Sequence, residues 1–554
     1  SEGGLLGNFK KTGTVPKLEE VRKRRMRVIP RADMMRRFER DANRRILREL
    51  PPEPATREAT IERLERGGFT LDLRRDFVEA YGDCLLAYDF ADEPQGQYIP
   101  NYMMLQSVYR EVDPDHPVLV ILNLNRTEFL PFMPIYYGDE YPVRSAKRGG
   151  RNPWAVTKMV RFCATHTKAP VWVMLQAFGG LPDYTWQLPD EAEMRLTIYE
   201  AIANGCKGIT FHGSSSPPCW RYNLYYFDTA RDSWGVESPA WPAMREAGRH
   251  VSAIGGALLL TDVSDVDVLN VVCEAMTDDA VPYRGPAVRA GVLRQRGADG
   301  YFAVVVNQDV KGLRQATLSV NAAAVSKGAT LHDLYVLTGR GGPAATETTI
   351  ELAPGDGRVF FVGTEAAAKP VFAEVHRGHY ANELPLYEID VEMAVANGCD
   401  TARPAALAAD AASAHEAAQF ATAHARILAA REALAETIAA STELAHAQRS
   451  LSEAQAMLAA VVLTYRRYFD VVMPPDLRKG AARGVVWKNT ADPNMQSYAD
   501  DTADALCLRM TLADRVQAGQ AKQSLQEITR LHQTAARLKA EAIPYVLARA
   551  NLPE

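Results

Sequence analysis

The sequence lacks the cysteine patterns that zinc ribbons and disulfide-rich domains require. Its 554 residues include seven cysteines, and no two of them form a C-x-x-C pair, which argues against both classes. It also lacks a phosphate loop, a dinucleotide fingerprint and an H-E-x-x-H motif. Because nucleotide and zinc chemistry depend on such motifs, we expect no cofactor and no bound metal.

Long apolar runs and a strong charge imbalance are absent as well. No run of about 20 apolar residues occurs, so we expect no insertion into a membrane. The formal net charge of -5 gives no electrostatic reason to expect nucleic acid as a partner. Arginines crowd the stretch from Arg22 to Arg75, but interleaved acidic residues favour a solvated helical surface. No signal peptide is visible, and the first residue is serine rather than methionine. These features alone therefore do not predict the cellular compartment.

Residues 83–213 alternate short apolar runs with helical patterns. We predict strands at 84–90, 117–123, 132–139, 171–176 and 208–212, and helices at 98–111, 153–167 and 191–204. Buried strands separated by helices are typical of a parallel sheet, and the repeated unit favours a (β/α)8-type (TIM) barrel. The first 80 residues offer only 4–9 and 26–29 as further strands, so the predicted α/β barrel is incomplete, remodelled or degenerate at its start.

The remainder of the chain changes character twice. Short strands near 287–293, 301–307, 316–320, 348–352 and 358–362, with Gly and Asp turns between them, predict an antiparallel β-sandwich. The chain is Ala-rich from about Thr401, and Leu444, Leu451 and Leu458 keep seven-residue spacing, which predicts a helical bundle. We interpret this bundle as serving packing or oligomerisation rather than catalysis. The predicted domains are therefore 1–80, 81–252 (barrel), 253–365 (sandwich) and 400–554 (helices).

Polar residues follow the predicted barrel strands at the ends where barrel enzymes place their reactive groups. In chain order these are Asp92, Glu93, Asn123, Asn125, Asp139, Glu140, Gln176 and His212. Glycoside cleavage needs one carboxyl group to protonate the leaving oxygen and a second to act as nucleophile or to activate water. Glu93 suits the acid role because an apolar strand precedes it and a proline follows it, which would shield its carboxyl group. The alternative is a structural carboxylate that caps the next helix.

Aromatic residues gather in the loops after the last two predicted barrel strands. They are Tyr184, Trp186, Trp220, Tyr222, Tyr225 and Tyr226. Flat rings at a barrel mouth can stack on sugar rings, or they can pack the barrel against the sandwich. We favour Trp186 and Trp220 as sugar contacts because polar or proline-rich loops surround them. His212 either binds a sugar hydroxyl or is a hydrogen-bonded histidine at a strand end.

The segment from Tyr88 to Pro94, YDFADEP, resembles the fourth-strand acid/base signature of clan A-type glycoside hydrolases, the β-galactosidase and cellulase superfamily. In this resemblance Glu93 matches the general acid/base, and Asp92 stands where most members carry an asparagine that holds the sugar 2-hydroxyl. Residues 139–142 resemble the Asp-x-Tyr-Pro loop after the sixth strand, and a small β-sandwich after the barrel is common in these enzymes. The resemblance covers about residues 83–363 and implies an extracytoplasmic or secreted protein that acts on carbohydrate.

One position departs from the family pattern. Gln176 occupies the place of the nucleophilic glutamate, and an amide can hydrogen-bond a sugar but can neither form a glycosyl ester nor act as a base. The second carboxylate would then come from Asp139 or Glu140, although Glu140 is equally explained as a solvated surface residue.

Two hypotheses about function follow. The first is a glycoside hydrolase that cleaves an oligo- or polysaccharide. Its candidate catalytic residues are Glu93, Asp139 and Glu140, and its candidate substrate-binding residues are Asp92, Asn123, Gln176, Trp186, His212 and Trp220. The second is an inactive protein on a glycosidase scaffold that binds carbohydrate or serves assembly through its C-terminal helices. Gln176, the Arg-rich start and the helical tail favour the second hypothesis.

Overall fold

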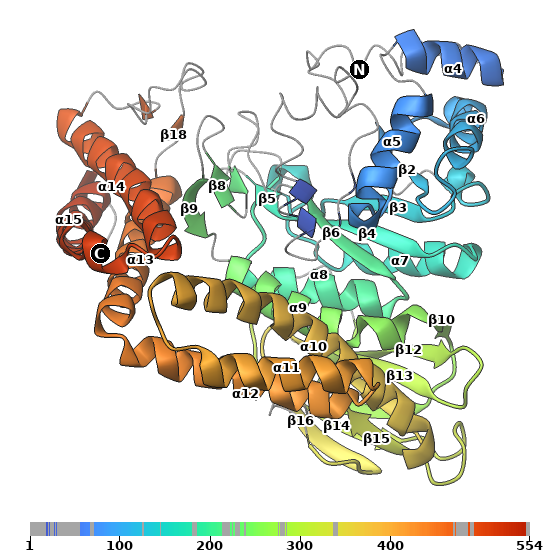
Figure 1. Ribbon diagram of the computed structural model, residues 1–554. Coiled ribbons are helices and arrows are strands. Elements are labelled where there is room, and N and C mark those ends of the chain that lie inside the picture. Colours follow the sequence, from blue (N-terminus) through green and yellow to red (C-terminus); the bar gives the residue numbers. More distant parts are fainter. Residues whose placement is uncertain are drawn as a thin grey trace. The chain divides into compact units, whose positions relative to one another are not determined.

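The computed structural model describes most of the chain after residue 55 (Figure 1). The described residues are 56–66, 71–123, 127–144, 146–179, 186–212, 240–274, 285–335, 342–468 and 492–549, with short pieces at 18–19, 21–22, 27, 29, 222–223, 225–227, 233–237, 276, 283, 471–472 and 486–487. They belong to two compact units. The first comprises Ser1–Glu140, Val156–Leu175 and Asn204–Thr210, and the second comprises Tyr141–Ala155, Gln176–Ala203 and Phe211–Glu554.

A five-stranded sheet forms the centre of the first unit, with its strands in chain order β1-β2-β3-β4-β6. The strands are β1 (Tyr88–Asp92), β2 (Val118–Asn123), β3 (Tyr136–Glu140), β4 (Val171–Gln176) and β6 (Gly208–His212). The helices before and between them are α4 (Arg57–Arg66), α5 (Leu71–Tyr81), α6 (Ile99–Arg110) and α7 (Ala155–His166). Strands β1 to β4 pair in parallel. This mixed α/β arrangement confirms the predicted parallel strands, and closure into a barrel stays a prediction.

The two faces of this sheet carry different side chains because successive residues of a strand point to opposite sides. On one face Leu119, Tyr137 and Met174 form a buried cluster with Ala87. On the other face helix α6 packs against β2, and Tyr136 of β3 contacts Cys163 of α7. There the hydroxyl of Tyr102 on α6 donates to the Val118 carbonyl at 2.8 Å. Continuous apolar strands are what such two-sided burial requires.

Three predictions near the start of the sheet are corrected. The first strand spans 88–92 rather than 84–90, because residues 82–84 form a 3-10 turn. The third spans 136–140 rather than 132–139. Of the strand predicted at 26–29, Arg27 and Ile29 are described and are not in a strand. The strand predicted at 4–9 lies outside the described residues.

Helix α8 (Glu191–Ala203) belongs to the second unit and is buried on nearly all sides. The helix predicted at 191–204 is present, but its charged Glu193 and Glu200 are as buried as its apolar residues. Each has an arginine partner, which is 42% exposed for Glu193 and 22% exposed for Glu200. Arg151 pairs with Glu193, and Arg289 pairs with Glu200.

Two antiparallel sheets follow in the second unit. One has the order β10-β12-β13-β17-β15 and the other β11-β14-β16. Their strands are β10 (Thr261–Ser264), β11 (Leu269–Cys273), β12 (Val288–Gln295), β13 (Tyr301–Asn307), β14 (Arg314–Val320), β15 (Thr330–Asp333), β16 (Glu347–Leu352) and β17 (Gly357–Gly363). One buried cluster draws side chains from both sheets, among them Val305, Leu318 and Phe360. This packing is that of a β-sandwich.

Short two-stranded sheets are formed by β5 (Phe178–Gly179) with β7 (Tyr222–Asn223), by β8 (Tyr225–Phe227) with β9 (Ser233–Glu237), and by β18 (Val471–Val472) with β19 (Val486–Trp487).

Seven helices make up most of the rest of the second unit. They are α9 (Ala240–Leu259), α10 (Glu365–Ala396), α11 (Ala402–Glu416), α12 (Phe420–Ala440), α13 (Thr442–Tyr468), α14 (Pro493–Gln517) and α15 (Ala521–Arg549). The predicted boundary between 252 and 253 falls inside α9, and α10 fills the segment 366–399 to which no domain was assigned. Within the described parts of the chain, no helix combines the length and apolar character needed to span a membrane.

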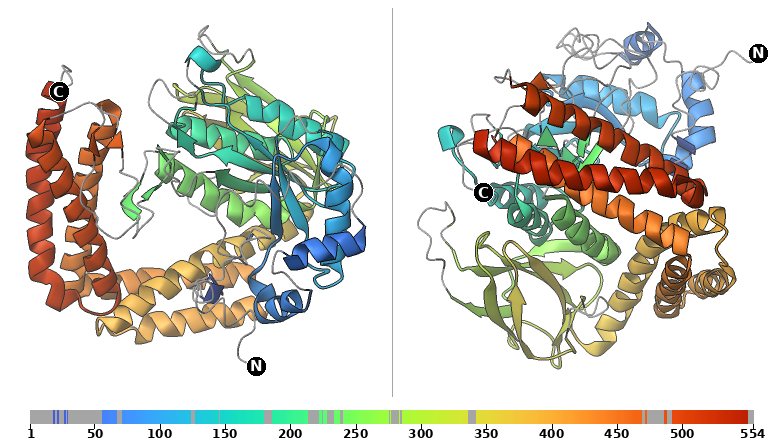
Figure 2. Two further views of the ribbon diagram at one scale, coloured as in Figure 1. Left: turned by 90° about the horizontal axis from the view of Figure 1, so that it is seen from above. Right: turned by 90° about the vertical axis from the view of Figure 1, so that its left-hand side faces the viewer.

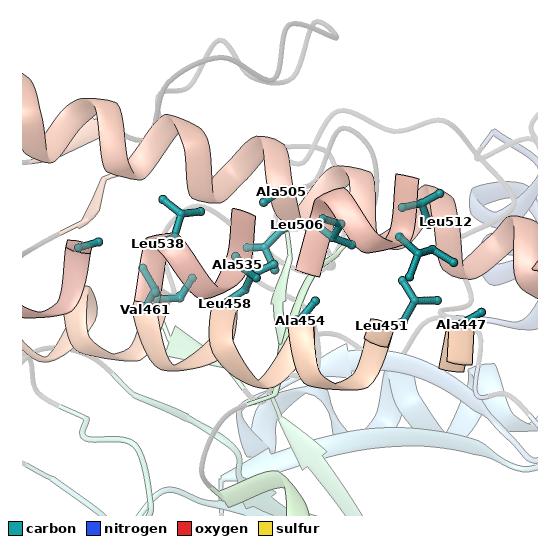
Figure 3. Packing of buried hydrophobic residues seen from close by; sticks show 14 of the residues in the cluster. Ala447, Leu451, Ala454, Leu458, Val461, Ala505, Leu506, Leu512, Ala535 and Leu538 are labelled. Atoms are coloured by element: carbon teal, nitrogen blue, oxygen red, sulfur yellow. The ribbon is translucent and has the colours of Figure 1, made fainter. Parts of the chain in front are cut away.

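Helices α10, α11 and α12 share one buried cluster, and α13, α14 and α15 share another. In Figure 2 the last three helices run side by side, and Figure 3 shows how Leu451 and Leu458 of α13 meet Leu506 and Leu538 of α14 and α15. Leu444, Leu451 and Leu458 are all buried, so the predicted seven-residue stripe is confirmed as a packing face. Self-association through these helices stays a prediction.

Candidate functional site

The carboxyl ends of β1, β2 and β3 bring together several of the residues predicted to act. Asp92 pairs with Ile121, and Asn123 pairs with Asp139. The backbone N–H of Glu93 donates to the Ile121 carbonyl at 2.8 Å, which extends the β1–β2 pairing by one residue. Because neighbouring strands lie about 4.8 Å apart, the backbones of β1 and β3 are about 10 Å apart at this edge. We call Asp92, Glu93, Asn123, Asp139 and Glu140 the carboxyl edge.

Glu93 has an unusual backbone conformation. Its φ of 49° lies in the left-handed region, and among the described non-glycine residues only Ala418 shares a positive φ. For a residue with a Cβ this conformation costs about 1–2 kcal/mol, and such strain clusters at functional sites. The Glu93 side chain is exposed. The expectation that the preceding strand and Pro94 would shield its carboxyl group is therefore wrong.

Asp139 and Glu140 occupy different environments although they are neighbours in β3. Asp139 is 6% exposed, whereas Glu140 is only partly buried. By the two-residue period of a strand, Asp139 lies on the same face as Tyr137 and Glu140 lies on the face of Tyr136. The Tyr137 hydroxyl is hydrogen-bonded to Thr210 at 2.7 Å on that first face. Asp139 is thus the carboxylate with the more enclosed position.

Gln176, in the second unit, is held by backbone groups. Its Oε1 accepts from the N–H of Val143 at 2.9 Å, and its Nε2 donates to the carbonyls of Val143, Phe178 and Gln187 at 3.0, 3.1 and 2.8 Å. The side chain is 3% exposed. These hydrogen bonds connect Val143 to the segment 176–187, which is far from it in sequence. They use both the oxygen and the nitrogen of the amide. We therefore do not include Gln176 among the residues that we propose to bind sugar.

Replacing Gln176 with glutamate would install the carboxylate that the family resemblance expects, but we expect loss of stability rather than gain of activity. The carboxylate would face three carbonyl oxygens with no proton to donate, and leaving such groups unsatisfied costs about 1–3 kcal/mol. Urea unfolding followed by circular dichroism measures the change. Gln95→Glu, at an exposed position, is the matched control with an expected change of less than about 0.5 kcal/mol. Equal stability of the two variants would contradict the structural role of Gln176.

Four aromatic side chains gather in the second unit, and we call Tyr141, Phe178, Trp186 and His212 the aromatic group. The His212 ring lies 5.5 Å from that of Tyr141 and 5.1 Å from that of Phe178. Trp186 meets Phe178 edge to face at 5.9 Å, and Tyr141 meets it at 4.9 Å. Trp186 and His212 are both partly buried. Both contact other rings of the group, and each keeps part of its surface exposed.

Tyr141 and Phe178 were not singled out from the sequence as site residues. The available signal was their place directly after a strand end, Tyr141 after Glu140 and Phe178 two residues after Gln176. Trp220, Tyr184 and Asn125 lie outside the described residues. Tyr222, Tyr225 and Tyr226 lie in the short strands β7 and β8. Over the part of the chain that the structure describes, no group of three or more His, Cys, Asp or Glu side chains has the geometry of a metal site.

No protein-family model and no curated protein matches the chain. Among solved structures, it is similar to several glycoside hydrolases at low identity. A candidate α-galactosidase from Bacteroides fragilis is 11% identical with a TM-score of 0.31, and the alignment covers 52% of this chain and 56% of that one. An α-galactosidase from Mortierella vinacea is 8% identical with a TM-score of 0.32, over 54% and 72% of the two chains. An α-L-arabinofuranosidase from Thermotoga petrophila is 10% identical with a TM-score of 0.30, over 55% and 78%.

Proposed function

We propose that the chain is an O-glycosyl hydrolase that cleaves an oligo- or polysaccharide at the carboxyl edge, with Glu93 as general acid and Asp139 as general base. The observation that carries this proposal is the position of two carboxyl residues at the carboxyl end of one parallel sheet, Glu93 directly after β1 and Asp139 in β3. One has a strained backbone and the other is nearly buried. Enzymes with parallel β/α architecture place their chemistry at this end.

In this mechanism Glu93 gives its proton to the glycosidic oxygen as the bond to the anomeric carbon breaks. Asp139 accepts a proton from a water molecule that attacks the same carbon from the opposite side. A bound sugar would cover the exposed Glu93 carboxyl group and exclude water from it. Asp92 and Asn123 are proposed to hold sugar hydroxyls, since both stand in the same strand-end row.

The spacing of the strands predicts the stereochemical outcome. Strands β1 and β3 are separated by one strand, so their backbones are about 10 Å apart. The proposal places the carboxyl groups of Glu93 and Asp139 about 6.5–9.5 Å apart, the separation that leaves room for a water in inverting enzymes. We therefore expect the product to have the inverted anomeric configuration, observed by proton NMR within the first minutes of reaction. Retention would contradict Asp139 as a base that acts through water.

A second candidate function is carbohydrate binding without cleavage. The observation that favours it is Gln176, whose amide stands where the resemblance expects the nucleophile and is tied to the backbone. The aromatic group would then provide the main sugar contact through stacking.

One experiment separates the two candidates. A panel of soluble glycans is tested with the wild type and with Glu93→Gln, and both the release of reducing ends and the retardation in glycan-containing gels are measured. The hydrolase proposal predicts cleavage by the wild type, with loss of cleavage and retained binding in the variant. Binding by the wild type without any cleavage would support the second candidate. If the wild type neither binds nor cleaves any glycan of the panel, both candidate functions are contradicted.

A further inference from the structure

Helices α9, α10 and α12 pack around a row of polar side chains, which we call the histidine seam. Its members are Arg249 and His250 of α9, His376, His379 and Glu383 of α10, and His424 and Arg431 of α12. His376, His379 and Glu383 are spaced i, i+3 and i+7, so they lie on one face of α10. His424 and Arg431 are spaced i and i+7 on α12. The α10–α12 interface thus contains these polar groups beside the apolar cluster that also joins the two helices.

The three histidines of α10 and α12 are in direct contact. The Nδ1 atoms of His376 and His424 lie 3.1 Å apart, a hydrogen bond in which one ring donates and the other accepts. The rings of His379 and His424 are stacked, with centroids 4.8 Å apart and an interplanar angle of 9°. His379 is 9% exposed and His424 is 5% exposed. Both contacts join α10 to α12.

The carboxylate in the seam is already paired. Glu383, 5% exposed, accepts from Arg249 at 2.5 Å through one oxygen and from Arg431 through the other. Three further charged residues of α10 do not pair with the seam histidines. Glu374 pairs with Arg377 one turn away on α10, and Asp390 lies within the field of Arg431.

Two further histidines, one beside the seam and one in it, contact tyrosine rings. His415 of α11 stacks on Tyr380, and His250 meets the Tyr335 ring edge-on at 4.6 Å. Because Glu383 already serves two arginines, added positive charge on the seam histidines would be poorly compensated.

Loss of hydration at this interface lowers the pKa of His379 and His424 to about 4, and it also lowers the pKa of His376. The positive charge of neighbouring groups adds to this effect for His379 and His424. Since these folded-state pKa values lie below the ordinary histidine value, the opened state binds protons more readily. The stability that the seam contributes is therefore complete at neutral pH and is lost as the pH falls below about 6.5, down to about 4.

We propose that the histidine seam is an acid-sensitive latch that holds α12 against α10 near neutral pH and releases the α11–α12 pair in mildly acidic solution. Protonation of the accepting nitrogen removes the His376–His424 hydrogen bond. It also places positive charges on rings that stack or touch, next to Arg249 and Arg431. The buried polar residues described in the bundle of α13, α14 and α15 are Ser450, Thr502 and Ser524. This bundle therefore has no buried histidine among its described residues and is expected to stay closed.

Hydrogen exchange of the full chain tests the latch. Exchange is measured at about pH 7 and about pH 5 and corrected for the intrinsic pH dependence of amide exchange. Peptides from α10 and α12 are compared with peptides from α13 and α15 in the same sample. Between about pH 7 and about pH 5, we expect the equilibrium constant for opening of α12 to increase on the order of tenfold for each of the two buried histidines. The opening constants of α13 and α15 should change little. An equal change in both bundles would overturn the proposal, and this comparison needs no variant.

Two variants sharpen the test. The double variant His379→Gln/His424→Gln should remove most of the pH dependence of α12 exchange. His446→Gln, at an exposed position of α13, should keep the wild-type profile. The latch is contradicted if the double variant folds and still opens at acid pH like the wild type. Added zinc should leave the exchange of α12 unchanged, and protection by zinc would assign a metal role to the histidines instead.

Discussion

Replacing Glu93 with glutamine is expected to lower kcat on any cleaved glycan by about 10²–10⁴-fold, the usual contribution of a general acid. The amide keeps the size of the side chain but has no proton acidic enough for the leaving oxygen. Because Glu93 is exposed and at a strand end, the change should leave folding intact and the binding of glycans within a few-fold. Initial rates of reducing-end release measure the loss.

The matched control is Glu79→Gln. Glu79 is also an exposed glutamate of the first unit, but it lies on α5, before the sheet. Its replacement should leave kcat unchanged. If both variants keep wild-type rates on a substrate that the chain cleaves, Glu93 has no part in the reaction.

Replacing Arg289 with leucine is expected to destabilise the second unit by about 3–5 kcal/mol, because it leaves a buried charge without its partner. The carboxylate of Glu200 is fully buried and accepts from Arg289 and from Gln308. Arg289 is on β12 and Glu200 is on α8, so the pair joins the helix to the sandwich. The leucine would add apolar volume but no donor. The loss should appear as a lower urea midpoint in circular dichroism.

Arg296→Leu is the control for this prediction. Arg296 also pairs with a carboxylate, that of Asp262 at 2.5 Å, but the two side chains are 51% and 61% exposed. Exposed pairs contribute about 0–1 kcal/mol, so this variant should unfold close to the wild type. Equal losses in the two variants would show that burial does not set the strength of the Glu200–Arg289 pair.

Strands that form continuous apolar runs could be predicted from the sequence alone. Residues 171–176, 208–212 and 301–307 match β4, β6 and β13 residue for residue. The start of β3 was placed too early because 132–135 is equally apolar but carries Pro134, which cannot donate to a ladder. The four-residue strands β10 and β15 contain too few residues for a period to appear.

Long-range pairing was not predictable in the same way. Glu193 and Glu200 look like the polar face of a surface helix until Arg151 and Arg289 are brought against them by segments 42 and 89 residues away in the chain. Gln176 was correctly placed at a strand end. Its role, however, depends on carbonyls of loops whose course no local pattern encodes. The positions at the carboxyl edge followed from strand order, whereas the exposure of Glu93 and the burial of Asp139 did not.

The cooperation of Glu93 and Asp139 is best tested by a double-variant comparison of kcat. Glu93→Gln, Asp139→Asn and the combined variant are assayed on the same glycan, after circular dichroism shows that each is folded. Residues that act together in one step give strongly non-additive losses. The account predicts that the combined variant loses little more than the worse single variant. Wild-type activity in Asp139→Asn, or losses that simply multiply, would contradict it.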